Sequence, residues 1–156
     1  MKFLVPVDGS TASINAVKKS IEIARKYDAS IKLISVVNHD DLSNFNKDSR
    51  HWRMLDGTII SDYEETSKKI KESTEKLLNA ITTELDFSGI KIEKEVLIGK
   101  PYEKILETAK NDNFDLIIMG NRGFSNIKRF FLGSVSQRVI SDAPCPVLVI
   151  HTDADI

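Results

Sequence analysis

The chain has 156 residues, of which 41% are hydrophobic and 29% are charged, and its formal net charge is -1. These values are typical of one globular domain that buries a single core. A near-neutral chain without a basic tail lacks the positive charge that general nucleic-acid or membrane-surface binding requires. We therefore expect neither a nucleic acid nor a membrane as a partner.

The cysteine and histidine content argues against a metalloprotein or a secreted scaffold. The single cysteine, Cys145, excludes an intramolecular disulfide and a multi-cysteine metal site, and it fits a reducing cytosol. The apolar start of the chain meets Asp8 too early for a signal peptide, and no apolar run approaches the roughly 18 residues of a membrane span. The histidines lie far apart and near no acid–serine arrangement, at His39, His51 and His151. We expect a soluble, cytoplasmic protein with no metal site of its own.

Short apolar runs alternate with amphipathic stretches along the chain. Short apolar runs predict buried strands at residues 3–7, 31–37, 116–119 and 146–150, and residues 90–98 are a further strand candidate, the third in chain order. Apolar residues at three- and four-residue steps predict helices, over residues 10–27, 63–85, 101–109 and 125–141. Ser10 is a suitable N-cap for the first helix, and Pro101 suits the first turn of the third. The alternation predicts a parallel sheet with helices on both faces.

Residues 38–62 are polar and show no regular period. They are predicted to form a long surface loop, because neither side of this segment could fold as a domain alone. The whole chain, residues 1–156, is thus expected to be a single domain. Trp52 lies in the middle of the loop and is expected to pack it onto the domain, with a role in covering a ligand as the alternative.

Three of the seven glycines fall in the segment GNRGFSNIKRFFLGS, residues 120–134, directly after the fourth predicted strand. Gly120 and Gly123 can take positive φ and leave room for a ligand against the main chain. The N–H groups of such a turn form an anion-binding concavity. The alternative is that these are ordinary turn glycines.

Gly133 lies within a predicted helical segment, where glycine costs up to about 1 kcal/mol relative to alanine. That cost is easier to accept if a helix restarts there and offers its N-terminal amides and the Ser134 hydroxyl to a phosphate. Counter-charge would come from Arg122, Lys128 and Arg129. The alternatives are close helix packing at Gly133 and a solvated basic helix face.

The first strand is also followed by polar residues, Asp8-Gly9-Ser10. Ligands of open parallel sheets bind beyond the carboxyl ends of the strands, where the strand order reverses. An order of 3-2-1-4-5 would bring the loops after the first and fourth strands into one crevice. These residues predict an anion or nucleotide site there, although a turn and an N-cap alone would also account for the first loop.

The spacing Gly120-x2-Gly123-x9-Gly133-Ser134 resembles the nucleotide-binding signature of the universal stress protein family, in its ATP-binding branch. The opening Leu4-Val-Pro-Val-Asp-Gly-Ser10 and the closing Ala143-Pro-Cys-Pro-Val-Leu-Val-Ile150 look like the first and last strands of that family. The resemblance covers nearly the whole chain, apart from residues 38–62 and the last few residues.

This resemblance implies a Rossmann-like α/β fold with a five-stranded parallel sheet in the order 3-2-1-4-5. It also implies a cytoplasmic homodimer formed through the last strand, Val147 to Ile150. The implied ligand is ATP, or ADP or AMP in its place, with Mg²⁺ as a companion of the phosphates. A stress-response role follows from the family, and neither the stress nor the downstream protein partner is implied.

The resemblance assigns the residues of the nucleotide site position by position. Pro6, Val7 and Asp8 would line the adenosine side, and Val36 or its neighbour Val37 would hold the adenine through main-chain contacts. The base, ribose and phosphate path would then follow along Met119, Gly120, Arg122 and Gly123. The phosphates would be received by Gly133, Ser134 and Val135.

Several functions fit these residues, and a regulatory nucleotide-binding protein is favoured. A slow or partner-stimulated ATPase is the alternative: no residue stands out to orient water, and no Walker sequence is present, so an efficient enzyme is not expected. A nucleotide-free dimeric scaffold is a further alternative, although members of that kind lack the glycine motif. Phospho-receiver chemistry is excluded because the third strand ends at Gly99 without an aspartate, and His151 stands where a lysine is needed.

Overall fold

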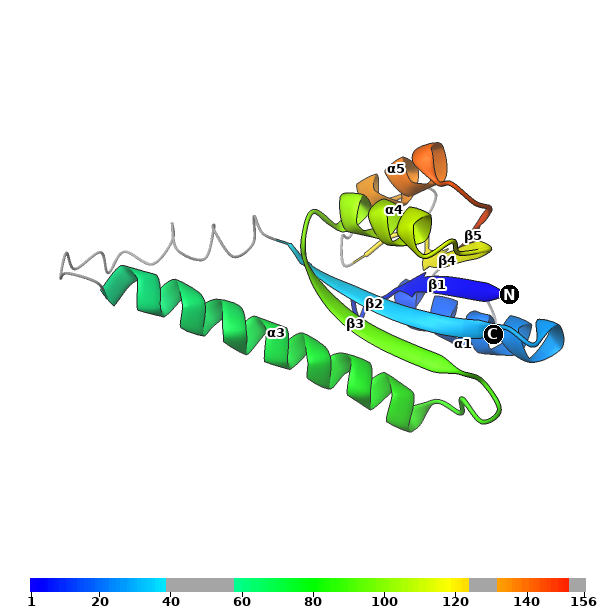
Figure 1. Ribbon diagram of the computed structural model, residues 1–156, viewed down its shortest axis with the longest axis horizontal. Helices are drawn as coiled ribbons and strands as arrows, with labels where there is room; N and C mark the ends of the chain where they lie inside the picture. Colours follow the sequence, from blue (N-terminus) through cyan, green and yellow to red (C-terminus); the bar gives the residue numbers. More distant parts are fainter. Residues whose placement is uncertain (39–57, 124–131, 152–156) are drawn as a thin grey trace.

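The computed structural model describes residues 1–38, 58–123 and 132–151. Its strands are all parallel and form a single sheet in the order β3-β2-β1-β4-β5, which confirms the predicted fold class (Figure 1). The strands are β1 (Lys2–Pro6), β2 (Ser30–Asn38), β3 (Ile92–Gly99), β4 (Leu116–Gly120) and β5 (Val147–Ile150). The helices of the described ranges are α1 (Thr11–Tyr27), α3 (Thr58–Glu84), α4 (Pro101–Asn111) and α5 (Ser134–Asp142).

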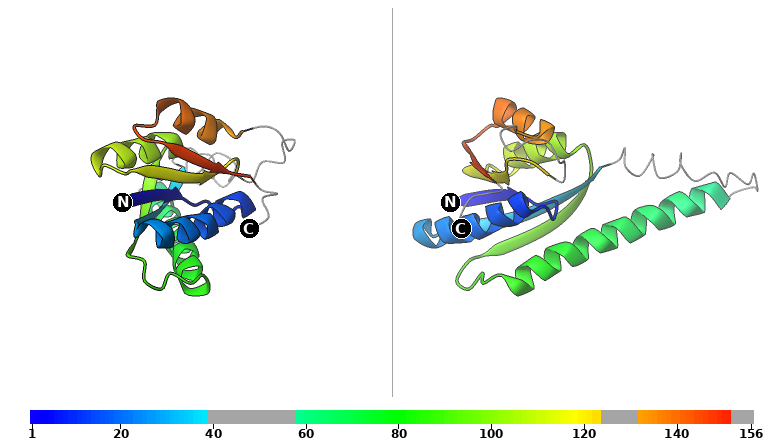
Figure 2. Two further views of the ribbon diagram at one scale, coloured as in Figure 1. Left: turned by 90° about the vertical axis from the view of Figure 1, so that its right-hand side faces the viewer. Right: turned by 180° about the vertical axis from the view of Figure 1, so that it is seen from behind.

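Helices cover both faces of the sheet. Figure 2 shows α4 and α5 on one face, with α1 and α3 on the other. Because side chains alternate along a strand, β1 contributes to two cores. Phe3 and Val5 join the cluster under α1 and α3, and Leu4 joins the cluster under α4 and α5, and all three are fully buried. Burial on both faces explains why β1 and β4 appear in the sequence as apolar runs. The edge strand β3 carries charged residues and is not buried.

The first helix begins and ends where its sequence predicts. The Ser10 side chain accepts a hydrogen bond from the Ser13 amide at 3.3 Å, which confirms Ser10 as the N-cap. At the other end, Asp28 adopts the left-handed conformation, with φ 50°, and its amide bonds to the Ala24 carbonyl oxygen. Aspartate tolerates this conformation better than most residues, so the helix stops there without a glycine.

The described strands lie within two residues of their predicted ranges, but two helices differ from prediction. Helix α3 begins at Thr58 rather than near residue 63, so the predicted loop 38–62 is shorter than expected, and Asn38 belongs to β2. Residues 39–57, including Trp52, lie outside the described residues. Helix α5 begins at Ser134, whereas helical periodicity extended back to residue 125, and residues 124–131 lie outside the described residues. Within the described part of the chain, no helix is long and apolar enough to cross a membrane.

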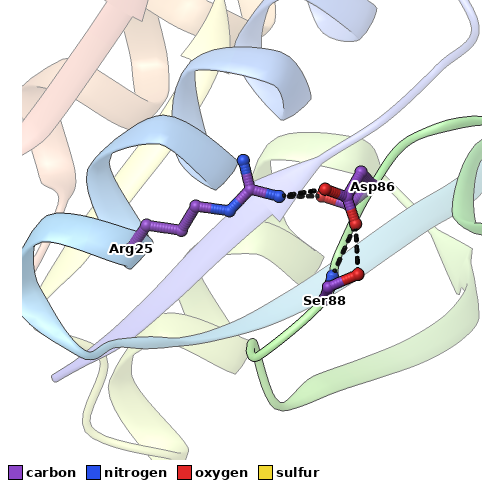
Figure 3. Close-up of polar contacts among 3 residues, drawn as sticks. All are labelled: Arg25, Asp86 and Ser88. Carbon is purple, nitrogen blue, oxygen red and sulfur yellow. Dashed lines mark hydrogen bonds and ion pairs between the residues drawn. The ribbon is translucent and has the colours of Figure 1, made fainter.

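A polar network joins the end of α1 to the turn that follows α3 (Figure 3). Arg25 donates to a carboxylate oxygen and to the carbonyl oxygen of Asp86, both at 2.7 Å. The other carboxylate oxygen of Asp86 accepts hydrogen bonds from the Ser88 hydroxyl and, at 2.9 Å, from the Ser88 amide. The bonds from Ser88, together with the charge of Arg25, hold the pKa of Asp86 below its usual value.

This network makes part of the stability dependent on pH. The pKa of Asp86 is lower in the folded than in the unfolded protein, so the ionised carboxylate stabilises the fold at neutral pH. We expect Asp86→Asn to lower the urea midpoint at pH 7. The deficit should shrink below about pH 4, as wild-type Asp86 becomes protonated. Asp142→Asn, at an exposed position on α5, is the control and should show no such deficit. A deficit of equal size at pH 7 and near pH 3 would contradict the expectation.

Candidate functional site

A cavity of about 300 Å³ lies at the carboxyl ends of β1, β2 and β4. This is the point where the strand order reverses, between β1 and β4. The cavity brings together all eleven site residues that the sequence predicted: Pro6, Val7, Asp8, Val36, Met119, Gly120, Arg122, Gly123, Gly133, Ser134 and Val135. Five further lining residues were missed: Ser13, Ile34, Pro101, Ile105 and Ser136.

One wall of the cavity is apolar. Ile34 and Val36 project from the same face of β2, two residues apart, and Ile105 of α4 lies across from them. Met119, at the end of β4, completes this wall. Val37, the alternative to Val36, is buried and does not line the cavity. Ile34 and Ile105 were missed because their apolar pattern identifies them equally well as core residues.

The opposite wall is the N-terminus of α5. Gly133 is the N-cap residue and has no side chain to satisfy the helix amides. The first hydrogen bond of the helix runs from the Gln137 amide to the Gly133 carbonyl oxygen, at 2.9 Å. The amides of Ser134, Val135 and Ser136 come before it and have no acceptor within the helix. This wall therefore combines N–H donors with the positive end of a helix dipole.

Hydrogen bonds fix the start of α5 to the end of β4. The Ser136 hydroxyl, which is buried, donates to the Gly120 carbonyl oxygen at 3.0 Å. The Gly133 amide donates to the Asn121 carbonyl oxygen at 2.8 Å, and the Asn121 amide donates to the Ile150 carbonyl oxygen at the same distance. The sequence prediction missed Asn121 and Ser136. For Asn121 the available signal was its position, since it is a polar residue placed directly after a fully apolar strand.

The motif glycines act through close contact, and neither Gly120 nor Gly123 uses the positive φ that glycine permits. A Cβ on Gly120 would lie 2.8 Å from the carbonyl carbon of Ala12 and 2.9 Å from the Ser13 amide nitrogen. A Cβ on Gly123 would lie 2.6 Å from Oδ2 of Asp8. Gly120 thus allows the end of β4 to touch the start of α1, and Gly123 allows the loop after β4 to approach Asp8. Of the glycines at this edge, Gly9 takes positive φ, at 84°.

The loop after β1 presents a carboxylate to the cavity. Oδ1 of Asp8 accepts bonds from the Ser10 amide at 2.9 Å and from the Ser10 hydroxyl at 2.5 Å. These bonds leave Oδ2 facing Gly123, so the loops after β1 and β4 meet as the sequence predicted. The Asp8 amide in turn donates a hydrogen bond to the Ser13 hydroxyl, at 3.4 Å. The loop after β1 therefore forms a turn and provides the N-cap of α1, and through Asp8 it also lines the cavity.

Positive charge at the site comes from Arg122, which lines the cavity. The other two predicted bases, Lys128 and Arg129, lie outside the described residues, as do His39 and His51. His151 follows β5, with Nδ1 3.5 Å from the side-chain nitrogen of buried Asn121. The described residues contain no group of three or more His, Cys, Asp or Glu side chains arranged to hold a metal ion.

The fold and the cavity together define a class of protein. A doubly wound α/β domain with a cavity at its switch point, apolar on one wall and lined by helix amides on the other, has a Rossmann-like architecture, in which the switch point is the usual place for a ligand. The model of the universal stress protein family matches residues 1–151. The chain belongs to the universal stress protein family.

Individual relatives agree with this membership. A universal stress protein of Methanocaldococcus jannaschii is 35% identical over 149 residues, which is 96% of this chain and 81% of that protein. Among solved structures, hypothetical protein MJ0577, solved for a structure-based assignment of its biochemical function, is 27% identical. Its TM-score is 0.78, and the match covers 96% of this chain and 94% of that one.

Two more distant structures of the family contain nucleotides. A universal stress protein in complex with cAMP is 22% identical, with a TM-score of 0.59 and coverage of 98% of both chains. A family protein from Arabidopsis thaliana with AMP bound is 20% identical, with a TM-score of 0.54 and coverage of 96% of this chain and 90% of that one. At these identities the likeness is one of fold.

Proposed function

We propose that this protein binds ATP, or a related adenine nucleotide, in the cavity at the switch point and acts as a regulatory protein in a stress response. One observation carries the proposal: the separate sequence motifs converge on one cavity that pairs an apolar wall with helix amides that have no acceptor within their helix. A nucleotide needs this combination, since its base is flat and largely apolar and its phosphates are anionic. The AMP and cAMP complexes of related proteins support the choice of an adenine nucleotide.

Each part of the nucleotide has a matching part of the cavity. The adenine would lie against Ile34, Val36 and Ile105, and the end of β2 would bond its edge through the main chain. The carboxylate of Asp8 would accept bonds from ribose hydroxyls. The phosphates would lie at the amides of α5, with Arg122 as counter-charge. Mg²⁺ would enter with the nucleotide and be held mainly by phosphate oxygens and water, as this ion prefers.

We also propose a homodimer formed through β5. This strand lies at one edge of the sheet, and Val147, Leu148 and Val149 are partly exposed. An exposed apolar edge strand is prone to pairing, and an isologous contact across a two-fold axis would cover it. Sedimentation equilibrium of the full chain tests this, and a monomer at all concentrations would contradict it.

Weak ATP hydrolysis stays the alternative function. The carboxylate of Asp8 is assigned to the ribose, so among the described lining residues no other acidic side chain is left to orient an attacking water, and any hydrolysis should be slow. Decay of added ATP in the presence of Mg²⁺ would separate an ATPase from a sensor that only binds.

Nucleotide binding is tested first on protein purified without added nucleotide. We expect mass spectrometry of the denatured protein to release an adenine nucleotide, and Gly123→Ala, Gly133→Ala and Ser134→Ala to carry much less. The effect should be largest for Gly123→Ala, because its methyl group would displace the Asp8 carboxylate. Ser141→Ala, at an exposed position in the last turn of the same helix, is the matched control.

The outcomes distinguish the candidate functions. Folded variants that lose nucleotide while Ser141→Ala keeps it would support the phosphate site. No released nucleotide, together with no binding of added millimolar ATP, would contradict the proposal. The glycines would then serve packing alone, and a nucleotide-free dimeric scaffold would be the better interpretation.

A further inference from the structure

A second cavity, of about 380 Å³, adjoins the first. It opens where the N-termini of α4 and α5 approach the end of β2, and we call it the side groove. Its lining residues are Asn38, Lys100, Pro101, Tyr102, Ser134, Val135 and Arg138. Pro101, Ser134 and Val135 also line the first cavity, so the two cavities share a wall. Figure 1 shows α4 and α5 side by side above the same face of the sheet.

The side groove carries positive charge. The guanidinium carbon of Arg138 lies over the Tyr102 ring, 4.4 Å from its centroid, in a cation–π contact. Within the part of the chain that the structure describes, Arg138 makes no ion pair. Its N–H fork is thus oriented without being neutralised, and such a fork matches phosphate oxygens.

Lys100 adds a second positive charge to the lining. Its ammonium lies 3.6 Å from a carboxylate oxygen of Glu103, and both side chains are more than half exposed, so water screens the pair. The same oxygen of Glu103 accepts a hydrogen bond from the Tyr102 hydroxyl at 2.9 Å. Among the residues that the structure describes, no acidic side chain lines the groove, and its charged lining residues are Lys100 and Arg138.

The shared wall identifies the kind of anion. Ser134 and Val135, at the start of α5, belong to both cavities and are the residues to which the proposed function assigns the phosphates. A phosphate chain that leaves the first cavity along this wall would enter the side groove between Lys100 and Arg138. The first cavity, at about 300 Å³, lies at the lower end of the range for ligand sites.

We propose that the side groove binds a phosphorylated group carried beyond the phosphates of a mononucleotide. The ligands of this protein would then include dinucleoside polyphosphates, bound with one nucleoside in the first cavity and the phosphate chain running between Lys100 and Arg138. This inference rests on the proposed nucleotide-binding function and names a wider class of ligand for the same site.

The test compares two nucleotides on the full-length protein by isothermal titration calorimetry. The ligands are ATP and diadenosine tetraphosphate. The variants are Lys100→Gln, Arg138→Gln and the double substitution, with Lys110→Gln, at an exposed position at the far end of α4, as the matched control. Arg138→Lys keeps the charge and removes the fork. Circular dichroism of each variant verifies that it is folded.

We expect wild-type protein to bind diadenosine tetraphosphate about tenfold more tightly than ATP, as one or two charge-assisted hydrogen bonds would produce. The double variant should lose this preference and still bind ATP normally, and Arg138→Lys should lose part of it. Lys110→Gln should keep it.

Three results would overturn the inference. The first is an unchanged preference in the double variant while ATP still binds, which leaves the proposed function intact. The second is an equal loss of affinity for both ligands, which would assign the side groove to the phosphates of ATP itself. The third is a wild-type protein that binds neither ligand, in which case the proposed function fails as well.

Discussion

Gly120→Ala is expected to lower the free energy of unfolding by about 1–3 kcal/mol, the usual cost of forcing extra atoms into a packed interior. The added methyl group would lie 2.8 Å from the carbonyl carbon of Ala12 and 2.9 Å from the amide nitrogen of Ser13. These are backbone atoms in the first turn of α1, so no side chain can rotate away to make room. Either α1 or the end of β4 has to move.

The measurement is urea unfolding of the variant beside Gly133→Ala. In that control the added methyl group would meet the Cα of Arg122 at 3.3 Å, and φ of Gly133 is -65°, which alanine adopts easily. A small adjustment suffices there, so the loss of stability should be clearly smaller. A Gly120→Ala protein as stable as Gly133→Ala would show that α1 is not packed against β4 as described.

Ser136→Ala should have the second largest effect, and it should act on two properties at once. The buried hydroxyl donates to the Gly120 carbonyl oxygen at 3.0 Å, and losing such a bond costs about 1 kcal/mol. The same bond fixes the start of α5 to the end of β4. We therefore expect the affinity for ATP to fall, while the affinity for adenosine, which has no phosphate, changes little.

Calorimetry with ATP and with adenosine separates this positioning role from a general loss of structure. Ser141→Ala removes a hydroxyl from the exposed end of the same helix and should affect neither stability nor binding. Equal losses of affinity for both ligands would mean that Ser136 supports the whole cavity and does not position the phosphate wall.

The parts of the fold that local pattern determines could be predicted from the sequence. The pattern located β1 and β4 well because these strands, buried on both faces, are runs of apolar residues, and Ser10 caps α1 as expected. The start of α3 was misplaced because the residues near Thr58 lack the strong apolar period that marks the rest of the helix. Periodicity alone did not detect the start of α5, but the cost of a glycine inside a helix indicated a restart at Gly133, and the structure confirms a helix that begins at Ser134 with Gly133 as its N-cap.

The candidate site divides in the same way. Motif residues such as Asp8 and Gly123 could be predicted because the loops that carry them follow strands, and strand ends meet at one edge of the sheet. Asn121 and Ser136 could not, since their roles depend on hydrogen bonds to residues distant in the sequence. The need for glycine at position 120 could not be predicted from the local pattern either, because the atoms that a Cβ would meet belong to α1, more than one hundred residues earlier in the chain.

The backbone of Asn121 has a role that extends beyond the cavity. Its amide bonds to Ile150 at the end of the edge strand, and its carbonyl oxygen bonds to Gly133 at the start of α5. One peptide segment thus joins the wall proposed for phosphates to the strand proposed for subunit pairing. If ligand occupancy strengthens the association of two subunits by some factor, thermodynamic linkage requires that association strengthen ligand binding by the same factor. The ligand affinity of such a protein would depend on its own concentration in the cell.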